Sequence, residues 1–166
     1  MYEERYKSLS SFIRKHKYVH GIFDVLYHVL PHMVVIMYFI TIAYKLYNRD
    51  YVSLIRIIAV PMMTFILCTV FRKVINEKRP YEIYNINPLI KKDKAGCSFP
   101  SRHTMSAAVI AMAELYVNIR VGIVAIVIAI LIAILRPVAG VHFVKDVIAG
   151  MAAGILFGII GFYIIP

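Results

Sequence analysis

The chain has 166 residues, of which 61% are hydrophobic, and its formal net charge is +10. Soluble domains are typically about 45–50% apolar, so this composition excludes an ordinary water-soluble fold and indicates a membrane protein in one unit. The positive charge suits a bilayer with anionic headgroups. We expect no nucleic-acid partner, because no soluble domain carries the charge.

Stretches free of charged residues recur along the chain and indicate membrane helices. A helix needs about 20 mostly apolar residues to cross the hydrocarbon layer, and Lys, Arg and Tyr at its ends can extend a shorter one. We expect helices at about 32–48, 51–75, 103–118, 120–136 and 143–165. The predicted fold is an all-α integral membrane bundle of five or six transmembrane helices.

The N-terminal segment, residues 1–31, precedes the predicted bundle of residues 32–166. Within it, 12–30 forms either an amphipathic helix on the membrane surface or a sixth, short span. Pro31 is expected to kink the helix. A polar stripe with a four-residue period lies on one helical face: His16, His20, Asp24, His28 and His32. It is either a proton path or metal site or, as we favour, a water-facing surface.

The one long connection, residues 76–100, is polar and rich in Lys, Asn, Pro and Tyr. Function tends to concentrate in such loops. Counting spans places this loop and the 137–142 turn on one side, and the tight turns at 48–50 and 118–120 on the other. Lys and Arg residues are numerous near the loop, and the positive-inside rule would therefore place the loop in the cytoplasm. The same residues could instead bind substrate, so they leave the side of the loop open.

Three segments meet on the side of the long loop: 72–80, 100–103 and 136–146. In the third, His142 and Asp146 are four residues apart, so a helix would place them on one face. The carboxylate could then accept an N–H from the imidazole and fix its tautomer. A solvated pair at a helix start is the alternative.

Arginines in these segments favour phosphate chemistry. Arg72, Arg79 and Arg136 project to the same side, and clustered guanidinium groups suit bidentate phosphate recognition. The helix that opens near Ser101 adds a hydroxyl and backbone N–H donors. Zinc ligation by His103, His142 and Asp146 is the alternative, but nearby positive charge disfavours a metal. Phosphoryl transfer needs such charge, with one histidine to attack and another to protonate the leaving oxygen.

The three segments are similar to the motifs of the type 2 phosphatidic acid phosphatase family. These membrane lipid phosphatases share their site with vanadium haloperoxidases and glucose-6-phosphatase. The family pattern is K-x6-R-P, P-S-G-H and S-R-x5-H-x3-D. Here it occurs as Arg72-x6-Arg79-Pro80, Pro100-Ser101-Arg102-His103 and Leu135-Arg136-x5-His142-x3-Asp146. Order and internal spacing match, and the resemblance covers about residues 50–166.

The resemblance implies a role for each matching residue. His142 would be the nucleophile that forms a phosphohistidine, Asp146 would orient it, and His103 would protonate the leaving group. The phosphoryl oxygens would be held by Arg72, Arg79, Arg136, the Ser101 hydroxyl and the Arg102 backbone N–H. Water would then hydrolyse the phosphoenzyme without any cofactor. The resemblance also favours a site at the outer face of a bacterial cytoplasmic membrane.

Three positions depart from the family pattern. Arg72 replaces Lys; the adjacent Lys73 is a secondary candidate, but it lies about 100° around the helix. Leu135 replaces Ser and removes a possible donor. Arg102 replaces Gly, and its side chain could add a contact to a diphosphate or a headgroup.

The expected activity is hydrolysis of a lipid phosphate whose chain lies in the bilayer. Undecaprenyl diphosphate is the first expectation, with phosphatidic acid and phosphatidylglycerol phosphate next. The alternative is a non-enzymatic protein that binds or transports a lipid phosphate. A small-residue face formed by Gly150, Gly154 and Gly158 suits either packing inside the bundle or a homodimer.

Overall fold

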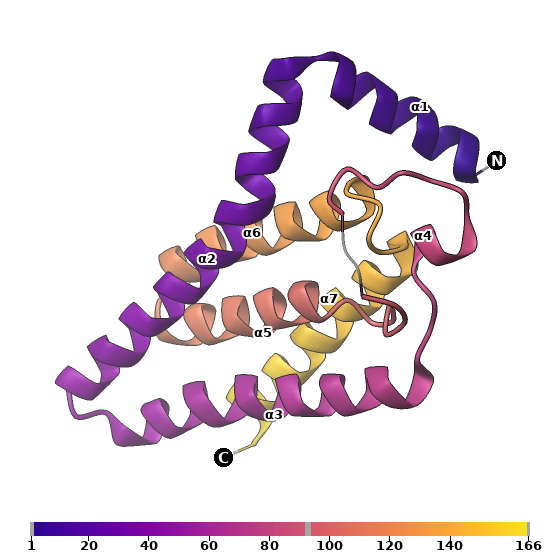
Figure 1. The fold of residues 1–166 in the computed structure, drawn as a ribbon. Helices are drawn as coiled ribbons and strands as arrows, with labels where there is room; N and C mark the ends of the chain where they lie inside the picture. Colours follow the sequence, from indigo (N-terminus) through magenta and orange to yellow (C-terminus); the bar gives the residue numbers. More distant parts are fainter. Residues whose placement is uncertain (1, 92–93, 166) are drawn as a thin grey trace.

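The chain folds into an all-helical bundle (Figure 1). The computed structural model describes residues 2–91 and 94–165. The helices are α1 (Tyr2–Lys15), α2 (Lys17–Tyr47), α3 (Tyr51–Ile75), α4 (Pro80–Ile83), α5 (Arg102–Val117), α6 (Ile119–Val138) and α7 (Val144–Ile159), which continues as the π-helical segment η1 (Ile160–Ile164). No strand occurs in the described part of the chain. The predicted all-α fold is confirmed.

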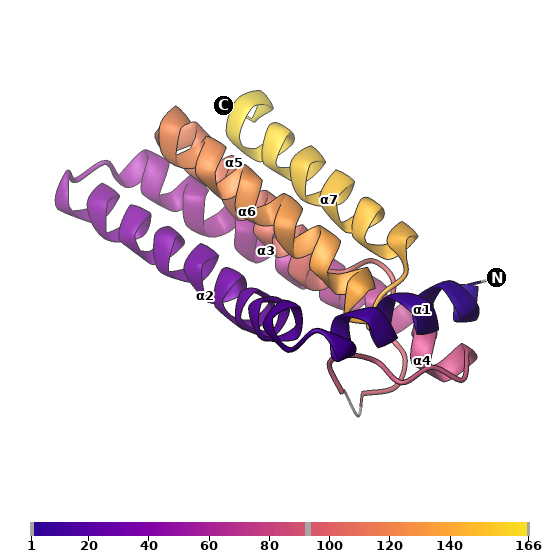
Figure 2. The ribbon, with the colours of Figure 1, turned by 90° about the horizontal axis from the view of Figure 1, so that it is seen from above.

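Four segments of the described chain are long and apolar enough to cross a membrane: Lys17–Tyr47, Tyr51–Ile83, Ile119–Val138 and Val144–Ile164. The shorter α5, of 16 residues, lies among them and packs most extensively on α6 and α7. Figure 2 shows α2, α3, α5, α6 and α7 side by side, with α1 and α4 together at one end. The bundle thus consists of four membrane-length helices around the buried α5.

The first long helix differs from the expected one. We expected a helix to begin at residue 32, but α2 begins at Lys17 and continues through Pro31. A proline inside a helix removes one backbone hydrogen bond and bends the helix, and the α2 ribbon bends in Figure 1. Leu30 and Val34 flank Pro31 and are buried in the core, so packing holds the two halves together. Residues 12–30 are therefore neither a separate surface helix nor a separate span.

The polar stripe on α2 lies at the protein surface. His28 and His32 are exposed, and each Nδ1 lies within hydrogen-bond distance of the backbone carbonyl one turn earlier, at 2.8 Å and 2.6 Å. Among the described residues, no group of three or more His, Cys, Asp and Glu side chains is placed to hold a metal ion. His28 and His32 thus contact their own helix, and a water-facing stripe stays a prediction.

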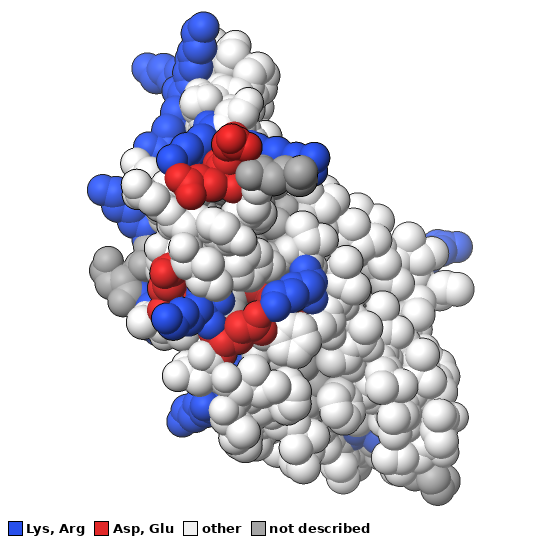
Figure 3. Space-filling view, turned by 90° about the vertical axis from the view of Figure 1, so that its right-hand side faces the viewer, with Lys and Arg blue, Asp and Glu red and all other residues white. Residues whose placement is uncertain are grey.

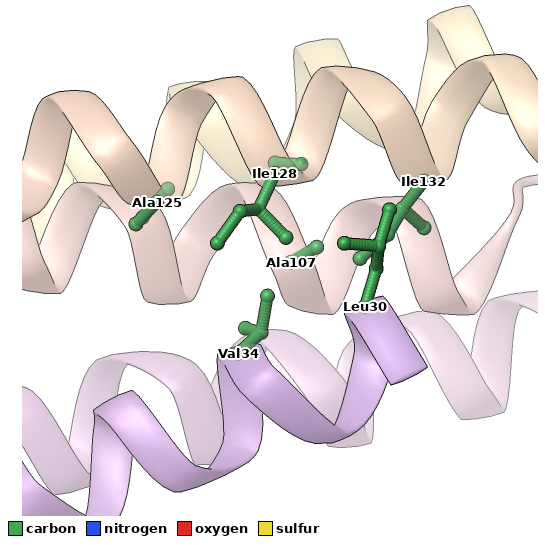
Figure 4. Close-up of a cluster of buried hydrophobic side chains, with 8 residues drawn as sticks. Leu30, Val34, Ala107, Ala125, Ile128 and Ile132 are labelled. Atoms are coloured by element: carbon green, nitrogen blue, oxygen red, sulfur yellow. The ribbon is translucent and has the colours of Figure 1, made fainter. Parts of the chain in front are cut away.

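Small side chains let α5 lie close to its neighbours. One core cluster joins Leu30 and Val34 of α2 to alanines of α5 and to Ala125, Ile128 and Ile132 of α6 (Figure 4). On the opposite side, α7 presents Gly150 and Gly154 to α5. A Cβ atom added at Gly150 would lie 2.6 Å from the Ser101 carbonyl oxygen.

The small-residue face of α7 is therefore covered within the chain. At Gly154 an added Cβ would lie 2.6 Å from both the Ala108 Cβ and the Met105 carbonyl oxygen, and Gly158 packs equally closely on Met112. The packing interpretation of this face is confirmed, and the face is not free to contact a second copy.

The N-terminal helix α1 holds the long loop in place at one end of the bundle. The Leu89 backbone N–H lies 3.1 Å from both the Tyr6 hydroxyl and the Ala139 carbonyl oxygen. Arg14 donates to the carbonyl oxygens of Asn87 and Pro88, each at 3.1 Å. The loop is thus bound both to α1 and to the turn after α6.

The close α5–α7 contact predicts a loss of stability when Gly154 is enlarged. Gly154→Ala would force α7 away from α5, and overpacking of this kind costs about 1–3 kcal/mol. We expect a lower melting temperature in detergent. Gly21→Ala is the matched control, because Gly21 also lies in a helix but has open space around its Cβ position, so alanine there should be neutral or stabilising. Equal melting temperatures for the two variants would contradict the packing.

Candidate active site

His142 and Asp146 form a buried pair where α6 turns into α7. The imidazole Nδ1 lies 3.4 Å from Asp146 Oδ2, and the two side chains are 3% and 0% exposed. His142 lies in the turn before Phe143, the residue that caps α7, and not on the helix as expected. The two side chains meet because Asp146 accepts the Phe143 backbone N–H at 2.9 Å, which directs the carboxylate back toward the turn.

Ser98 completes this pair, and sequence analysis did not identify it. Its hydroxyl donates to Asp146 Oδ2 at 2.5 Å and lies 3.4 Å from His142 Nδ1. Ser98 is fully buried, and its backbone N–H donates to the Glu77 carbonyl oxygen at 2.8 Å. Asp146 Oδ2 therefore receives donors from the long loop, from the turn and from the imidazole. Ser98 lies outside the three motifs, and no spacing connects it with residue 146.

Burial keeps His142 neutral. Desolvation lowers the pKa of its imidazole from about 6.5 to about 4; Asp146 opposes this shift, and the charges of Arg79 and Arg72 add to it. A neutral imidazole carries one proton on its two nitrogens. With Nδ1–H directed at Asp146, the lone pair of Nε2 is available to attack an electrophile.

Arg72 and Arg79 bind the long loop to the rest of the site. The Arg72 guanidinium, on α3, donates to the carbonyl oxygens of Cys97 and Pro100. Arg79 Nε donates to the Gly96 carbonyl oxygen at 3.0 Å, and one of its terminal nitrogens lies 3.4 Å from the Val141 carbonyl oxygen. Both side chains are buried. Arg79 therefore links the loop to the turn that carries His142.

Arg136 is held by a residue that sequence analysis missed. Its guanidinium donates to the Tyr27 hydroxyl at 2.7 Å and lies over the same ring, 4.4 Å from the centroid. Tyr27 lies on α2, and no motif marked it. Leu135, the neighbour of Arg136, packs in the apolar core.

The three motif arginines carry unbalanced charge. Within the described residues no ion pair involves Arg72, Arg79 or Arg136, and Arg79 interacts electrostatically with the other two. Buried charges are costly without a counter-charge. The arrangement therefore favours an anion beside His142. Lys73 is exposed next to buried Arg72, so its side chain points away from this centre.

The second motif begins α5 beside the pair. Ser101 is fully buried; its backbone N–H donates to the Asp146 carbonyl oxygen at 2.8 Å, and its hydroxyl lies 3.0 Å from the Thr104 hydroxyl. His103, in the first turn, is exposed. Arg102 and His103 line a groove of about 190 Å³ whose other walls come from α2, α3 and α6. His142 is buried and does not line this groove.

Comparisons with known proteins identify a family. The model of the PAP2 superfamily matches residues 50–166. Undecaprenyl-diphosphatase BcrC of Bacillus subtilis (strain 168) is 30% identical over 86 residues, which are 52% of this chain and 44% of that protein. The match thus spans less than half the length of this curated relative.

Two solved structures share the fold. Aquifex aeolicus LpxE aligns with a TM-score of 0.73 and 24% identity, over 95% of this chain and 92% of that one. The transmembrane PAP2-type phosphatidylglycerolphosphate phosphatase from Bacillus subtilis aligns with a TM-score of 0.70 and 24% identity, over 95% and 82%. At this identity the similarity shows the fold alone.

The depressed pKa of His142 predicts how stability depends on pH. The folded-state value near 4 lies below the unfolded value of about 6.5. The contribution of His142 to stability is therefore present above pH 6.5 and is lost as the pH falls through 4. We expect the melting temperature of His142→Asn to depend less on pH in this window than that of the wild type.

NMR of histidine-labelled protein checks the same prediction directly. One imidazole should titrate near 4 in the wild type, and its signal should be missing in His142→Asn. His28→Asn, at an exposed position on α2, is the control. A value near 6.5 for His142 would contradict the buried, neutral state.

Proposed function

The chain belongs to the PAP2 superfamily, and from this membership we propose that it is a membrane lipid phosphatase that works through a phosphohistidine at His142. The observation that carries the proposal is the neutral, buried imidazole held by Asp146 at 3.4 Å beside three arginines without a carboxylate partner among the described residues. A nucleophile within a set of uncompensated guanidinium groups is what phosphoryl transfer requires.

The proposed reaction has two steps. His142 Nε2 attacks the phosphorus, the bond from phosphorus to the lipid oxygen breaks, and His103 donates a proton to that oxygen. Water, deprotonated by His103, then attacks the phosphohistidine and releases inorganic phosphate. The charges of Arg72, Arg79 and Arg136 stabilise the equatorial oxygens in both steps. No metal ion or other cofactor has a role in this scheme.

The Ser101 hydroxyl and the Arg102 backbone N–H are proposed as further phosphate donors. The Arg102 N–H lies in the first turn of α5 and needs no bond within the helix. Among the described residues, the Ser101 hydroxyl forms a hydrogen bond with the Thr104 hydroxyl, and it would have to rotate toward a phosphate. Lys73 is the less suitable candidate because its side chain is exposed.

The substrate we propose is a lipid with its phosphate at the interface and its chain in the bilayer. Undecaprenyl diphosphate comes first, supported by the name of the BcrC relative. Phosphatidylglycerol phosphate, named for one structural neighbour, and phosphatidic acid follow. The proposed location is a bacterial cytoplasmic membrane with the site at its outer face. Figure 3 shows most charged side chains gathered on one part of the surface, beside a broad face with few of them, which suits a protein at a bilayer surface.

Phosphate release from lipid phosphates in detergent, with a chelator present, tests the proposal. We expect turnover by the wild type and a loss of at least about 10³-fold in His142→Ala, because the nucleophile is removed. His28→Ala, at an exposed position on α2, is the control and should retain full activity.

The other outcomes separate the alternatives. Equal turnover by wild type and His142→Ala would refute the nucleophile assignment. Loss on chelation would favour a metal-dependent hydrolase. Binding of lipid phosphates by the wild type without turnover would favour a binding or transport protein.

The Ser98 contact predicts a selective loss of turnover. Ser98→Ala removes the hydroxyl that donates to Asp146 Oδ2, and one such bond is worth about 1.5 kcal/mol. The carboxylate then orients His142 less well, so we expect kcat to fall roughly tenfold with KM nearly unchanged. Ser11→Ala, at an exposed position on α1, is the control. A rise in KM with constant kcat would show that Ser98 acts in binding instead.

A further inference from the structure

We propose that the Arg102 side chain selects lipid diphosphates over lipid monophosphates by binding the phosphate that leaves. The inference rests on the proposed function, because it assumes that His103 protonates the leaving oxygen. The Arg102 side chain would act in addition to its backbone N–H.

Arg102 lies directly beside the proposed acid, His103. It is the first residue of α5 and directly precedes His103. Its guanidinium lies 5.1 Å from the centroid of the Phe65 ring on α3, and both residues line the groove of about 190 Å³ together with His103. Contact with an aromatic face holds a guanidinium in place without neutralising it. The cation is thus fixed beside the proposed acid.

The groove beside Arg102 is mostly apolar. Except for Arg102, His103 and Ser106, the residues that line it are apolar: Pro31, Val34, Val35, Phe65, Ala107, Ile110 and Ile132. Such a surface suits the first carbons of a lipid chain. The Ser106 hydroxyl is buried there without a hydrogen-bond partner among the described residues. The polar groups in the groove therefore come from the first turns of α5, where the lipid chain would meet its phosphate.

Arg102 adds a fourth positive charge to those of the three motif arginines. Arg102 forms no ion pair within the described residues, and it interacts electrostatically with Arg72. The three motif arginines already supply charge for one phosphoryl group. A fourth cation next to His103 has little to bind if the leaving group is a neutral alcohol. It has a charge-assisted partner if the leaving group is itself a phosphate.

The proposed reaction on a lipid diphosphate ends at the lipid monophosphate. His142 Nε2 attacks the terminal phosphorus, and the bond to the bridging oxygen breaks with its electron pair on that oxygen. His103 supplies the proton, and Arg102 binds the departing lipid monophosphate. Water then hydrolyses the phosphohistidine to inorganic phosphate. The monophosphate product lacks the second phosphate, so we expect the enzyme to release one phosphate for each diphosphate and to act slowly on the product.

Two substrates with the same chain test the inference: farnesyl diphosphate and farnesyl monophosphate, assayed in detergent micelles. For wild type we expect a higher kcat/KM on the diphosphate. Arg102→Gln keeps the backbone N–H and should lower kcat/KM for the diphosphate roughly 30-fold, the usual effect of losing one charge-assisted bond. Its kcat/KM for the monophosphate should fall much less, so the ratio of the two values should decrease, and an unchanged melting temperature would show that the variant is folded. Arg102→Lys should recover part of the loss.

Lys94→Gln is the matched control, because it removes one exposed positive charge from the long loop and should affect neither substrate. Equal losses on both substrates in Arg102→Gln would overturn the inference in favour of a general electrostatic role. No change on either substrate would overturn it in favour of a packing contact with Phe65. In both cases turnover by the wild type would persist and the proposed function would stand. Absence of turnover by the wild type on both substrates would refute the proposed function itself.

Discussion

The site depends on Asp146, whose main chain and side chain join segments that are far apart in the sequence. Its carbonyl oxygen accepts the Ser101 backbone N–H at 2.8 Å, while Oδ2 accepts from Ser98 at 2.5 Å and from the Phe143 N–H at 2.9 Å. One residue thus fixes the start of α5, the end of the long loop and the turn that carries His142. A buried carboxylate is stable only with such donors. The contacts that assemble the site therefore also stabilise the buried Asp146 carboxylate.

The arginines act on the backbone as well as on electrostatics. Arg72 and Arg79 bind loop carbonyl oxygens, and Arg136 binds Tyr27, which satisfies part of their hydrogen-bonding capacity while leaving their charge uncompensated. That charge contributes to the low pKa of His142. The site therefore combines a neutral imidazole with a strong preference for an anion. A bound phosphate would add negative charge beside the imidazole and stabilise the positive charge that it acquires on attack.

The bundle determines where this chemistry meets the lipid. Close packing of α7 on α5 through Gly150 and Gly154 brings Ser101 within hydrogen-bond distance of Asp146. The other side of the α5 N-terminus remains open as the groove next to Arg102 and His103. The buried pair on one side of α5 and the apolar groove on the other would then meet at the first turn of α5, where Arg102 and His103 line the groove.

The sequence by itself determined the helical membrane fold and the motif residues, because span length and short spacings are local properties. The His142–Asp146 pair is an example: the two residues are four positions apart, and local turn geometry brings them together. Only the tertiary structure decided that Ser98 and Tyr27 belong to the site, since their partners lie 48 and 109 residues away and no local pattern encodes such contacts. It also decided that α2 continues past Pro31: Leu30 and Val34 pack in the core on either side of the proline, and that packing outweighs the one hydrogen bond that proline removes.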